Sequence, residues 1–148
     1  MIKIKKLIII FIALLLITLT SCGIIPPIQN INYRVLLIGA GDYDGGCADD
    51  LTAPPYAVDS MEELFSRCYD IEVLTILKDK KATKQNILNE IWYTFKDAEE
   101  DDVSIFYWAG HGQYKYNTFN LLPTDYLTEG RISVTELEYL LDKIAGTK

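Results

Sequence analysis

The sequence has few of the residues that build metal centres and nucleic-acid surfaces. It contains one histidine, His111, and three cysteines in 148 residues, and no two cysteines have the spacing of a metal site. Its 14 lysines and arginines are outnumbered by 21 acidic residues, so the net charge is −7, and no basic stripe is interleaved with aromatic residues. We therefore expect no metal or other cofactor and no nucleic-acid partner, and we leave a requirement for calcium open.

Long apolar runs are confined to the start of the chain. Three lysines precede an unbroken apolar run over residues 7–17, which is too short for a membrane span and is typical of a secretory signal. Residues 19–22, Leu-Thr-Ser-Cys, resemble the bacterial lipobox, in which the cysteine receives lipid and becomes the new N-terminus. We predict a lipoprotein signal peptide over residues 1–22 with lipidation at Cys22. An ordinary signal peptide with an incidental cysteine is the alternative.

Lipidation would attach the mature chain to a membrane of the cell envelope. The residue after Cys22 is Gly23 and not aspartate. In a diderm host, this resembles the signal of lipoproteins that are sorted to the outer membrane. Outside the cytoplasm Cys47 and Cys68 could form a disulfide, but Cys68 also fits as a small buried residue at a helix end.

The remaining chain reads as one domain. Residues 23–32, with two prolines, form the predicted tether, and the domain itself covers residues 33–148. Short apolar runs without alternation predict buried strands at residues 33–39, 71–77 and 103–109. Helical spacing of apolar residues predicts helices after Pro55, after Thr83 and after Ser133; the residues expected on their buried faces are Ala57, Met61, Leu64, Phe65 and Cys68, then Ile87, Leu88, Ile91, Trp92 and Phe95, then Val134, Leu137, Leu140, Leu141 and Ile144.

This alternation of strands and helices predicts a parallel sheet covered on both faces, an α/β fold. In such sheets, ligands and catalytic groups gather beyond the carboxyl ends of the strands. Two unusual segments stand there: a Gly- and Asp-rich loop over residues 40–55, and Gly110-His111-Gly112 after the third strand. The glycines would let the backbone turn sharply and let a substrate approach the imidazole, which suits general acid–base work near neutral pH. A tight turn with a bystander histidine is the alternative.

The segment "VSIFYWAGHGQ" resembles the histidine strand of the caspase- and metacaspase-like cysteine peptidases. The segments "YRVLLIGAGDYD", "LTAPPYAVDSMEELF", "IEVLTILKDKKATKQNILNEI" and "NLLPTDYLTEGRISVTELEYLL" resemble, in order, further segments of that family. The resemblance runs from about residue 33 to residue 148. It implies a caspase-like (caspase-hemoglobinase) three-layer α/β/α fold with a mostly parallel sheet, incomplete at the C-terminus.

The resemblance also implies roles for individual residues. His111 matches the histidine of the catalytic dyad, and Gly112 matches the residue whose amide helps to form the oxyanion hole. Asp59 matches an acidic residue that lines a pocket for basic residues in metacaspases, although an acid in the first turn of a helix is also stabilised by the helix dipole. Asp42 lies in the loop after the first strand, near the expected cleft. The implied activity is hydrolysis of protein or peptide substrates, after basic residues.

Two departures from the family pattern stand out. Ala109 occupies a place where metacaspases often have serine. The nucleophilic cysteine of the family, in a D-x-C-x-S-G-like segment, would be expected near residue 161, roughly 50 residues after the histidine. We therefore interpret the sequence as the N-terminal portion of such a peptidase, inactive as it stands, and Cys47 as a less favoured candidate nucleophile.

Two other functions remain open at this point. One is a catalytically inactive caspase-like module that binds partners at the cell surface. The other is nucleotide binding by "GAGDYDGG", but its glycines do not fit the G-x-G-x-x-G pattern and its acidic residues would repel phosphate.

Overall fold

The computed structural model describes residues 31–45 and 48–148. The predicted signal peptide, the lipidation site Cys22, residues 23–30 of the predicted tether and the candidate nucleophile Cys47 lie outside the described residues. The last tether residue, Asn32, already joins the domain, because its carbonyl accepts a hydrogen bond from the Val103 amide. No helix in the described part of the chain is long and apolar enough to cross a membrane.

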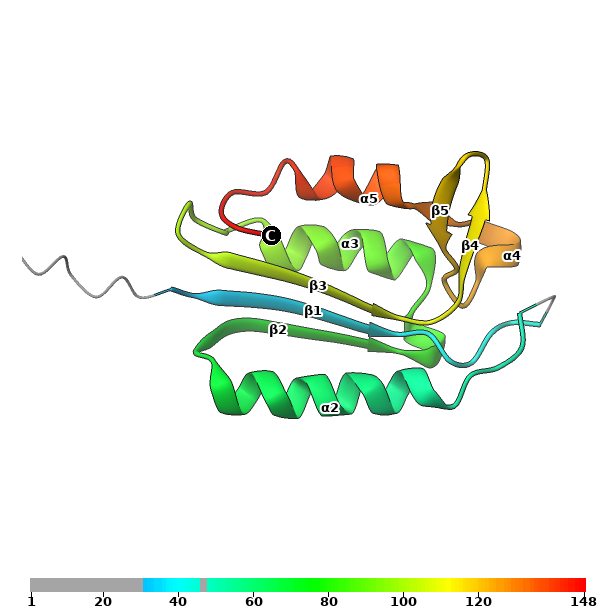
Figure 1. Ribbon diagram of the computed structural model, residues 1–148, viewed down its shortest axis with the longest axis horizontal. Coiled ribbons are helices and arrows are strands. Elements are labelled where there is room, and N and C mark those ends of the chain that lie inside the picture. Colours follow the sequence, from blue (N-terminus) through cyan, green and yellow to red (C-terminus); the bar gives the residue numbers. More distant parts are fainter. Residues whose placement is uncertain (1–30, 46–47) are drawn as a thin grey trace, which may run out of the picture. The chain divides into compact units, whose positions relative to one another are not determined.

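Three parallel strands form the centre of the domain, and each lies where the sequence predicts it. They are β1 (Tyr33–Gly39), β2 (Ile71–Lys78) and β3 (Val103–Ala109), in the order β2-β1-β3. Helix α2 (Ala53–Cys68) covers one face, and α3 (Lys84–Phe95) and α5 (Val134–Leu141) lie over the other (Figure 1). The expected three-layer α/β/α arrangement with a parallel sheet is therefore confirmed.

Strand β1 is buried on both faces, which explains the unbroken apolar run over its residues 35–39. Its Val35 and Leu37 pack with Val58 and Phe65 of α2. Its Leu36 and Ile38 point to the other face, where they join the larger core cluster that α3 and α5 complete; that cluster includes Ile87, Ile91, Phe95 and Leu137. Alternate side chains of β1 therefore belong to the hydrophobic cores on the two faces of the sheet.

The helices begin where local chemistry favours a start. Pro54 and Pro55 stand in the first turn of α2, where a missing N–H costs nothing. The side chains of Thr83 and Ser133 accept hydrogen bonds from the amides of Asn86 and Glu136, so both predicted N-caps are confirmed.

Three side chains expected on buried helix faces are exposed instead. Leu64 and Cys68 face solvent because the contact face of α2 runs through Pro54, Val58 and Phe65. Trp92 is 64% exposed because the face of α3 centres on Ile87, Ile91 and Thr94. Cys68 is exposed, and Cys47, with which it could form a disulfide, lies outside the described residues, so that pairing stays a prediction.

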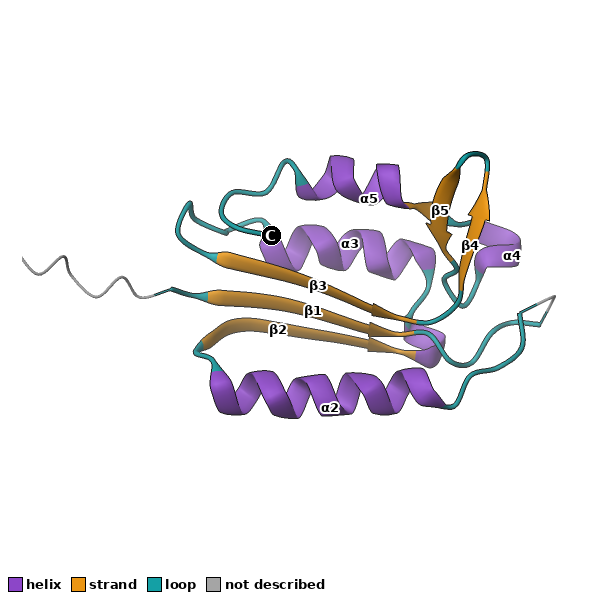
Figure 2. Cartoon of the chain, viewed as in Figure 1, coloured by secondary structure: helices purple, strands orange, loops and turns teal. Residues whose placement is uncertain are grey.

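A small antiparallel sheet follows the histidine segment and was not predicted. It consists of β4 (Gly112–Lys115), β5 (Thr118–Leu121) and β6 (Ile132–Ser133), with the short helix α4 (Tyr126–Glu129) between β5 and β6. Figure 2 shows the β4–β5 hairpin beyond the carboxyl ends of the parallel strands. Tyr116 and Asn117 have φ angles of 56° and 60°, the two left-handed residues of a type I′ hairpin turn.

The chain after α5 returns to the free edge of β3. Helix α5 ends at Leu141, and Gly146 then lets the chain pass close to the turn before β3. Its φ of 81° is left-handed, and Thr147 then forms a parallel bridge with Val103. Apart from this bridge, no strand among the described residues pairs with that edge of β3.

Candidate functional site

The carboxyl ends of the three parallel strands place two loops side by side. Gly39 at the end of β1 is in register with Lys78 of β2 and with Ala109 of β3. The Ala40 amide donates to the Ala109 carbonyl over 2.8 Å, so the loops that follow β1 and β3 start in contact. The Gly- and Asp-rich loop and His111 therefore share one edge of the sheet, as the sequence predicts.

Gly110 is required where β3 meets its loop. A Cβ atom at this position would lie 2.9 Å from the Trp108 ring and 3.0 Å from both the Ala40 Cβ and the Tyr43 hydroxyl. Gly112 is under no such restriction, because a Cβ there would meet only the Asn120 carbonyl at 3.6 Å. The first glycine lets the two loops approach closely, and the second leaves space next to the imidazole.

This difference gives a stability prediction. Gly110→Ala is expected to destabilise the fold by about 1–3 kcal/mol, the usual cost of overpacking, because it pushes backbone and ring atoms apart. Gly112→Ala is the matched control. It should change the free energy of unfolding by less than about 1 kcal/mol, the usual difference between glycine and alanine within a helix or strand. Urea unfolding of both variants measures the difference. Equal losses in the two variants would contradict the packing argument.

Tyr43, from the loop after β1, fixes the backbone of His111. The His111 amide donates a hydrogen bond to the Tyr43 hydroxyl over 2.8 Å, and the two ring centres lie 5.0 Å apart. Burial raises the pKa of the Tyr43 hydroxyl above its usual value of 10.0, an effect that the hydrogen bond from His111 opposes and the nearby Tyr126 reinforces. The hydroxyl therefore remains neutral, and an acceptor for the His111 amide, throughout the physiological pH range.

A backbone carbonyl fixes the imidazole ring itself. Nε2 of His111 lies 2.9 Å from the carbonyl oxygen of Asp49. A carbonyl oxygen can only accept, so the neutral ring must carry its proton on Nε2. The other ring nitrogen, Nδ1, is then an unprotonated acceptor and is the atom that can take a proton from a nucleophile or substrate.

His111 and Gly112 line a cavity of about 340 Å³ at this edge of the sheet. The remaining lining residues come from the loop after β1, from the hairpin and from the segment around α4: Ala48, Gln113, Leu122, Tyr126, Leu127 and Arg131. Arg131 is the single side chain in this lining with a permanent charge. The two residues to which the sequence assigns catalytic roles are therefore brought together in one cavity.

Asp42 lines a different, shallow pocket of about 370 Å³, together with Asp50 and Asp79. One oxygen of Asp42 lies 3.2 Å from the Nζ of Lys80, and Asp44 lies 2.6 Å from the same atom. The hydrogen bonds to Asp44 and Asp42 raise the pKa of Lys80. The pocket is acidic, and one lysine at its rim partly offsets that charge.

Asp59 lines neither pocket. It is the seventh residue of α2 and pairs with Lys78 at the end of β2. The alternative explanation of Asp59 as an acid in the first helical turn is therefore wrong, because α2 begins at Ala53 and no acidic residue stands in its first turn.

The described residues contain no thiol near His111. Cys68 is the last residue of α2 and is followed by the start of β2. It therefore lies at the amino ends of the parallel strands, whereas His111 follows their carboxyl ends. A seven-residue strand such as β1 spans roughly 20 Å at the usual rise per residue, so Cys68 and His111 are far apart. Within the described ranges, no cluster of three or more His, Cys, Asp or Glu side chains could hold a metal ion.

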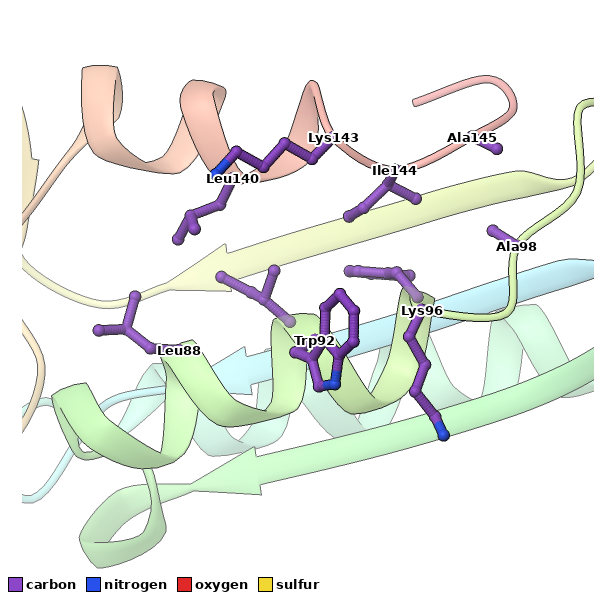
Figure 3. A pocket seen from close by; sticks show the side chains of 10 residues that line it. Leu88, Trp92, Lys96, Ala98, Leu140, Lys143, Ile144 and Ala145 are labelled. Atoms are coloured by element: carbon purple, nitrogen blue, oxygen red, sulfur yellow. The ribbon is translucent and has the colours of Figure 1, made fainter.

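A second pocket of about 340 Å³ lies between α3 and the segment that begins with α5. Figure 3 shows Leu88, Trp92, Leu140 and Ile144 around it, and its charged lining residues are Lys96 and Lys143. None of its lining residues is a nucleophile or a general base at neutral pH. This pocket therefore offers an apolar surface with two positive charges and no acid–base group for catalysis.

Sequence reasoning missed Tyr43, the Asp49 carbonyl and Arg131. Tyr43 and Asp49 lie 68 and 62 residues before His111. A contact over such a separation leaves no local pattern, although their place in a long Gly- and Asp-rich loop after a strand was a general signal. Arg131 stands in an unremarkable polar segment, and no signal in the sequence distinguishes it.

Comparison with known proteins agrees with this geometry. Residues 33–145 match the family model of the caspase domain, peptidase family C14. A search of the curated proteins gave no match. Among solved structures, protein GSU0716 from Geobacter sulfurreducens is similar, with a TM-score of 0.65 and 22% sequence identity; the alignment covers 77% of this chain and 46% of that protein, so this chain spans less than half of the other's length. With the family model matching most of its length, the chain belongs to the caspase-domain family of peptidases.

Proposed function

We propose that this chain is the histidine-bearing part of a cysteine-type endopeptidase that cleaves peptide bonds after basic residues. The observation that carries the proposal is the hydrogen bond between the Nε2 of His111 and the Asp49 carbonyl. It leaves Nδ1 as the proton acceptor in a cavity that Gly112 also lines. The thiol is supplied from outside the described residues.

In the proposed reaction, Nδ1 of His111 removes the proton from the cysteine thiol, and the thiolate attacks the carbonyl carbon of the scissile bond. The negative charge on the carbonyl oxygen is stabilised by hydrogen-bond donors, among which we place the Gly112 amide. The imidazolium returns its proton to the leaving amine as the C–N bond breaks. Water then hydrolyses the thioester, with His111 again acting as base.

The acidic pocket supports a preference for a basic residue before the scissile bond. Asp42, Asp50 and Asp79 line it with one neighbouring lysine, so a guest ammonium or guanidinium would meet an excess of carboxylates. Asp59 lines neither this pocket nor the cavity beside His111, and it pairs with Lys78. We therefore assign the basic side chain to the pocket that contains Asp42.

A panel of fluorogenic peptides tests both the activity and the preference. The protein, expressed from its native gene, is expected to cleave peptides with Lys or Arg before the scissile bond and not their Leu or Asp counterparts. Asp42→Asn should lower kcat/KM for the basic peptides roughly tenfold, through loss of a charge-assisted hydrogen bond. Asp70→Asn, at the opposite edge of the sheet, is the matched control and should have no effect.

Two other outcomes of this assay would reject the proposal. A preference for acidic or apolar residues before the bond would remove the role of Asp42. If none of the peptides is cleaved, the catalytically inactive binding module is favoured instead, and His111 would serve only to hold the loops together.

A further inference from the structure

The cavity beside His111 contains an arginine that forms no ion pair with any residue the structure describes. Arg131 lies between Gly130, whose φ of 82° turns the chain at the end of α4, and the start of β6. Its side chain lines the cavity together with His111 and Gly112. Across residues 31–45 and 48–148, no carboxylate forms an ion pair with it.

The guanidinium is also incompletely hydrogen bonded. Its Nε atom is buried and has no hydrogen-bond partner among the described residues. Its central carbon lies 5.9 Å from the centre of the Tyr126 ring, so an aromatic side chain limits where the group can move. A guanidinium keeps its charge at all physiological pH values, and buried donors in proteins nearly always have an acceptor. An anion in the cavity would therefore bind to a positive charge that no carboxylate in the described part of the chain compensates.

Both pockets are lined by parts of one short segment, residues 48–51, and this segment also contacts His111. Ala48 lines the cavity that contains Arg131, whereas Asp50 and Leu51 line the acidic pocket. Between them, the Asp49 carbonyl holds the imidazole. A peptide with its scissile bond at His111 would therefore extend one flank toward the acidic pocket and the other toward Arg131.

We propose that Arg131 binds the carboxylate of an acidic residue that directly follows the scissile bond. The inference rests on the proposed function, which assigns the basic residue before the bond to the acidic pocket. The preferred substrates are then peptides in which Lys or Arg is followed by Asp or Glu. Two subsites of opposite charge also fix the direction in which the peptide lies across His111, because the reversed peptide would place like charges together.

Four peptides with Lys before the scissile bond and Asp, Glu, Ala or Lys after it test this proposal. Their C-termini are amidated, so a carboxylate can come only from the side chain. The protein expressed from its native gene should show a kcat/KM roughly tenfold higher for the Asp and Glu peptides than for the Ala peptide, the gain expected from one charge-assisted hydrogen bond. The Lys peptide should be the poorest substrate.

Variants at two arginines separate a local contact from the general charge of the protein. Arg131→Met should lower kcat/KM for the Asp and Glu peptides to the value that the same variant shows for the Ala peptide, mainly through KM. Arg131→Lys keeps the charge and should retain part of the preference. Arg67→Met, on the exposed face of α2 where Arg67 pairs with Glu63, is the matched control and should keep the full preference. Melting temperatures show whether each variant is folded.

The outcomes distinguish this inference from the function on which it rests. If the Lys-containing peptides are cleaved without preference for Asp or Glu, or if Arg131→Met keeps that preference, the role of Arg131 is wrong and the peptidase function stands. If Arg67→Met loses the preference as well, the effect belongs to net charge and the proposal is also rejected. If no peptide is cleaved by the unmodified protein, both proposals fail together.

Discussion

In the proposed peptidase, expressed from its native gene, replacing His111 with alanine is expected to lower kcat/KM for cleavage after basic residues by about 10²–10⁴-fold, the usual contribution of a positioned general acid–base. The loss should appear in kcat, since the imidazole acts on the proton and not on the binding of the peptide. The proton acceptor would be Nδ1, because Nε2 is committed to the Asp49 carbonyl. Peptide hydrolysis by the two proteins under identical conditions measures the effect.

The fold of the His111→Ala variant should be nearly unchanged, which makes the comparison direct. The contacts that place residue 111 are made by its backbone: its amide donates to Tyr43, and its carbonyl accepts from the Leu122 amide over 3.1 Å. Both hydrogen bonds survive the loss of the ring. A melting temperature within a few degrees of the unmodified protein is the required control.

The tautomer of His111 can be observed independently of catalysis. Because the chain contains one histidine, the imidazole gives a single set of nitrogen signals in an NMR spectrum of ¹⁵N-labelled protein. We expect the neutral ring to carry its proton on Nε2. A proton on Nδ1 instead would contradict the assignment of Nδ1 as the base, even if His111→Ala is inactive.

The elements of the fold could be predicted because each depends on residues that are close in sequence. The strands at 33–39 and 103–109 are apolar except for Arg34 and Ser104, since the central sheet is covered on both faces, and such runs have definite ends. The helix starts at Thr83 and Ser133 follow from the hydroxyl groups that cap them. The common edge of the two loops then follows from the parallel arrangement of the strands.

The details of the site could not be predicted because they depend on contacts between distant residues. The position of the imidazole is set by a tyrosine hydroxyl and a carbonyl from the loop after β1, and a backbone carbonyl has no sequence signature. The β4–β5 hairpin was missed because its left-handed turn uses Tyr116, a residue that rarely adopts a positive φ. Asp59 was expected in the first turn of α2, but the helix begins at Ala53, which makes Asp59 its seventh residue.

The largest stability effect is expected at the opposite edge of the sheet, where Asp102 and Arg34 form a buried pair. Arg34 is 5% exposed and Asp102 is 2% exposed, and the Nε of Arg34 lies 3.3 Å from an Asp102 oxygen. The same oxygen accepts a hydrogen bond from the Glu99 amide over 3.0 Å. Glu72, at 2.6 Å, is the second partner of Arg34. The carboxylate of Asp102 thus joins β1 to the turn before β3.

Asp102→Asn removes the charge with little change of shape and is expected to destabilise the fold by about 3 kcal/mol, the lower end of the range for breaking a buried pair, because Glu72 still compensates Arg34. For a domain of this size, that corresponds to a melting temperature roughly 6–12 °C lower. The matched control is Asp101→Asn, because Asp101 is the exposed neighbour in the same turn and should cost almost nothing. Similar losses in the two variants would show that the buried pair does not stabilise the domain.

The pH dependence of the stability lost in Asp102→Asn shows whether the loss comes from the carboxylate charge. The hydrogen bond from the Glu99 amide, together with the Arg34 guanidinium, lowers the pKa of Asp102 below its usual value of 3.8, against the opposing effect of burial. A carboxyl group with a lowered pKa in the folded state stabilises the fold above its unfolded pKa, and this stabilisation is lost as the pH falls through the folded pKa. The gap in unfolding free energy between the unmodified protein and Asp102→Asn should therefore be constant near neutral pH and should narrow below about pH 4. A gap that stays constant down to pH 2 would mean that the loss comes from packing and not from the carboxylate charge.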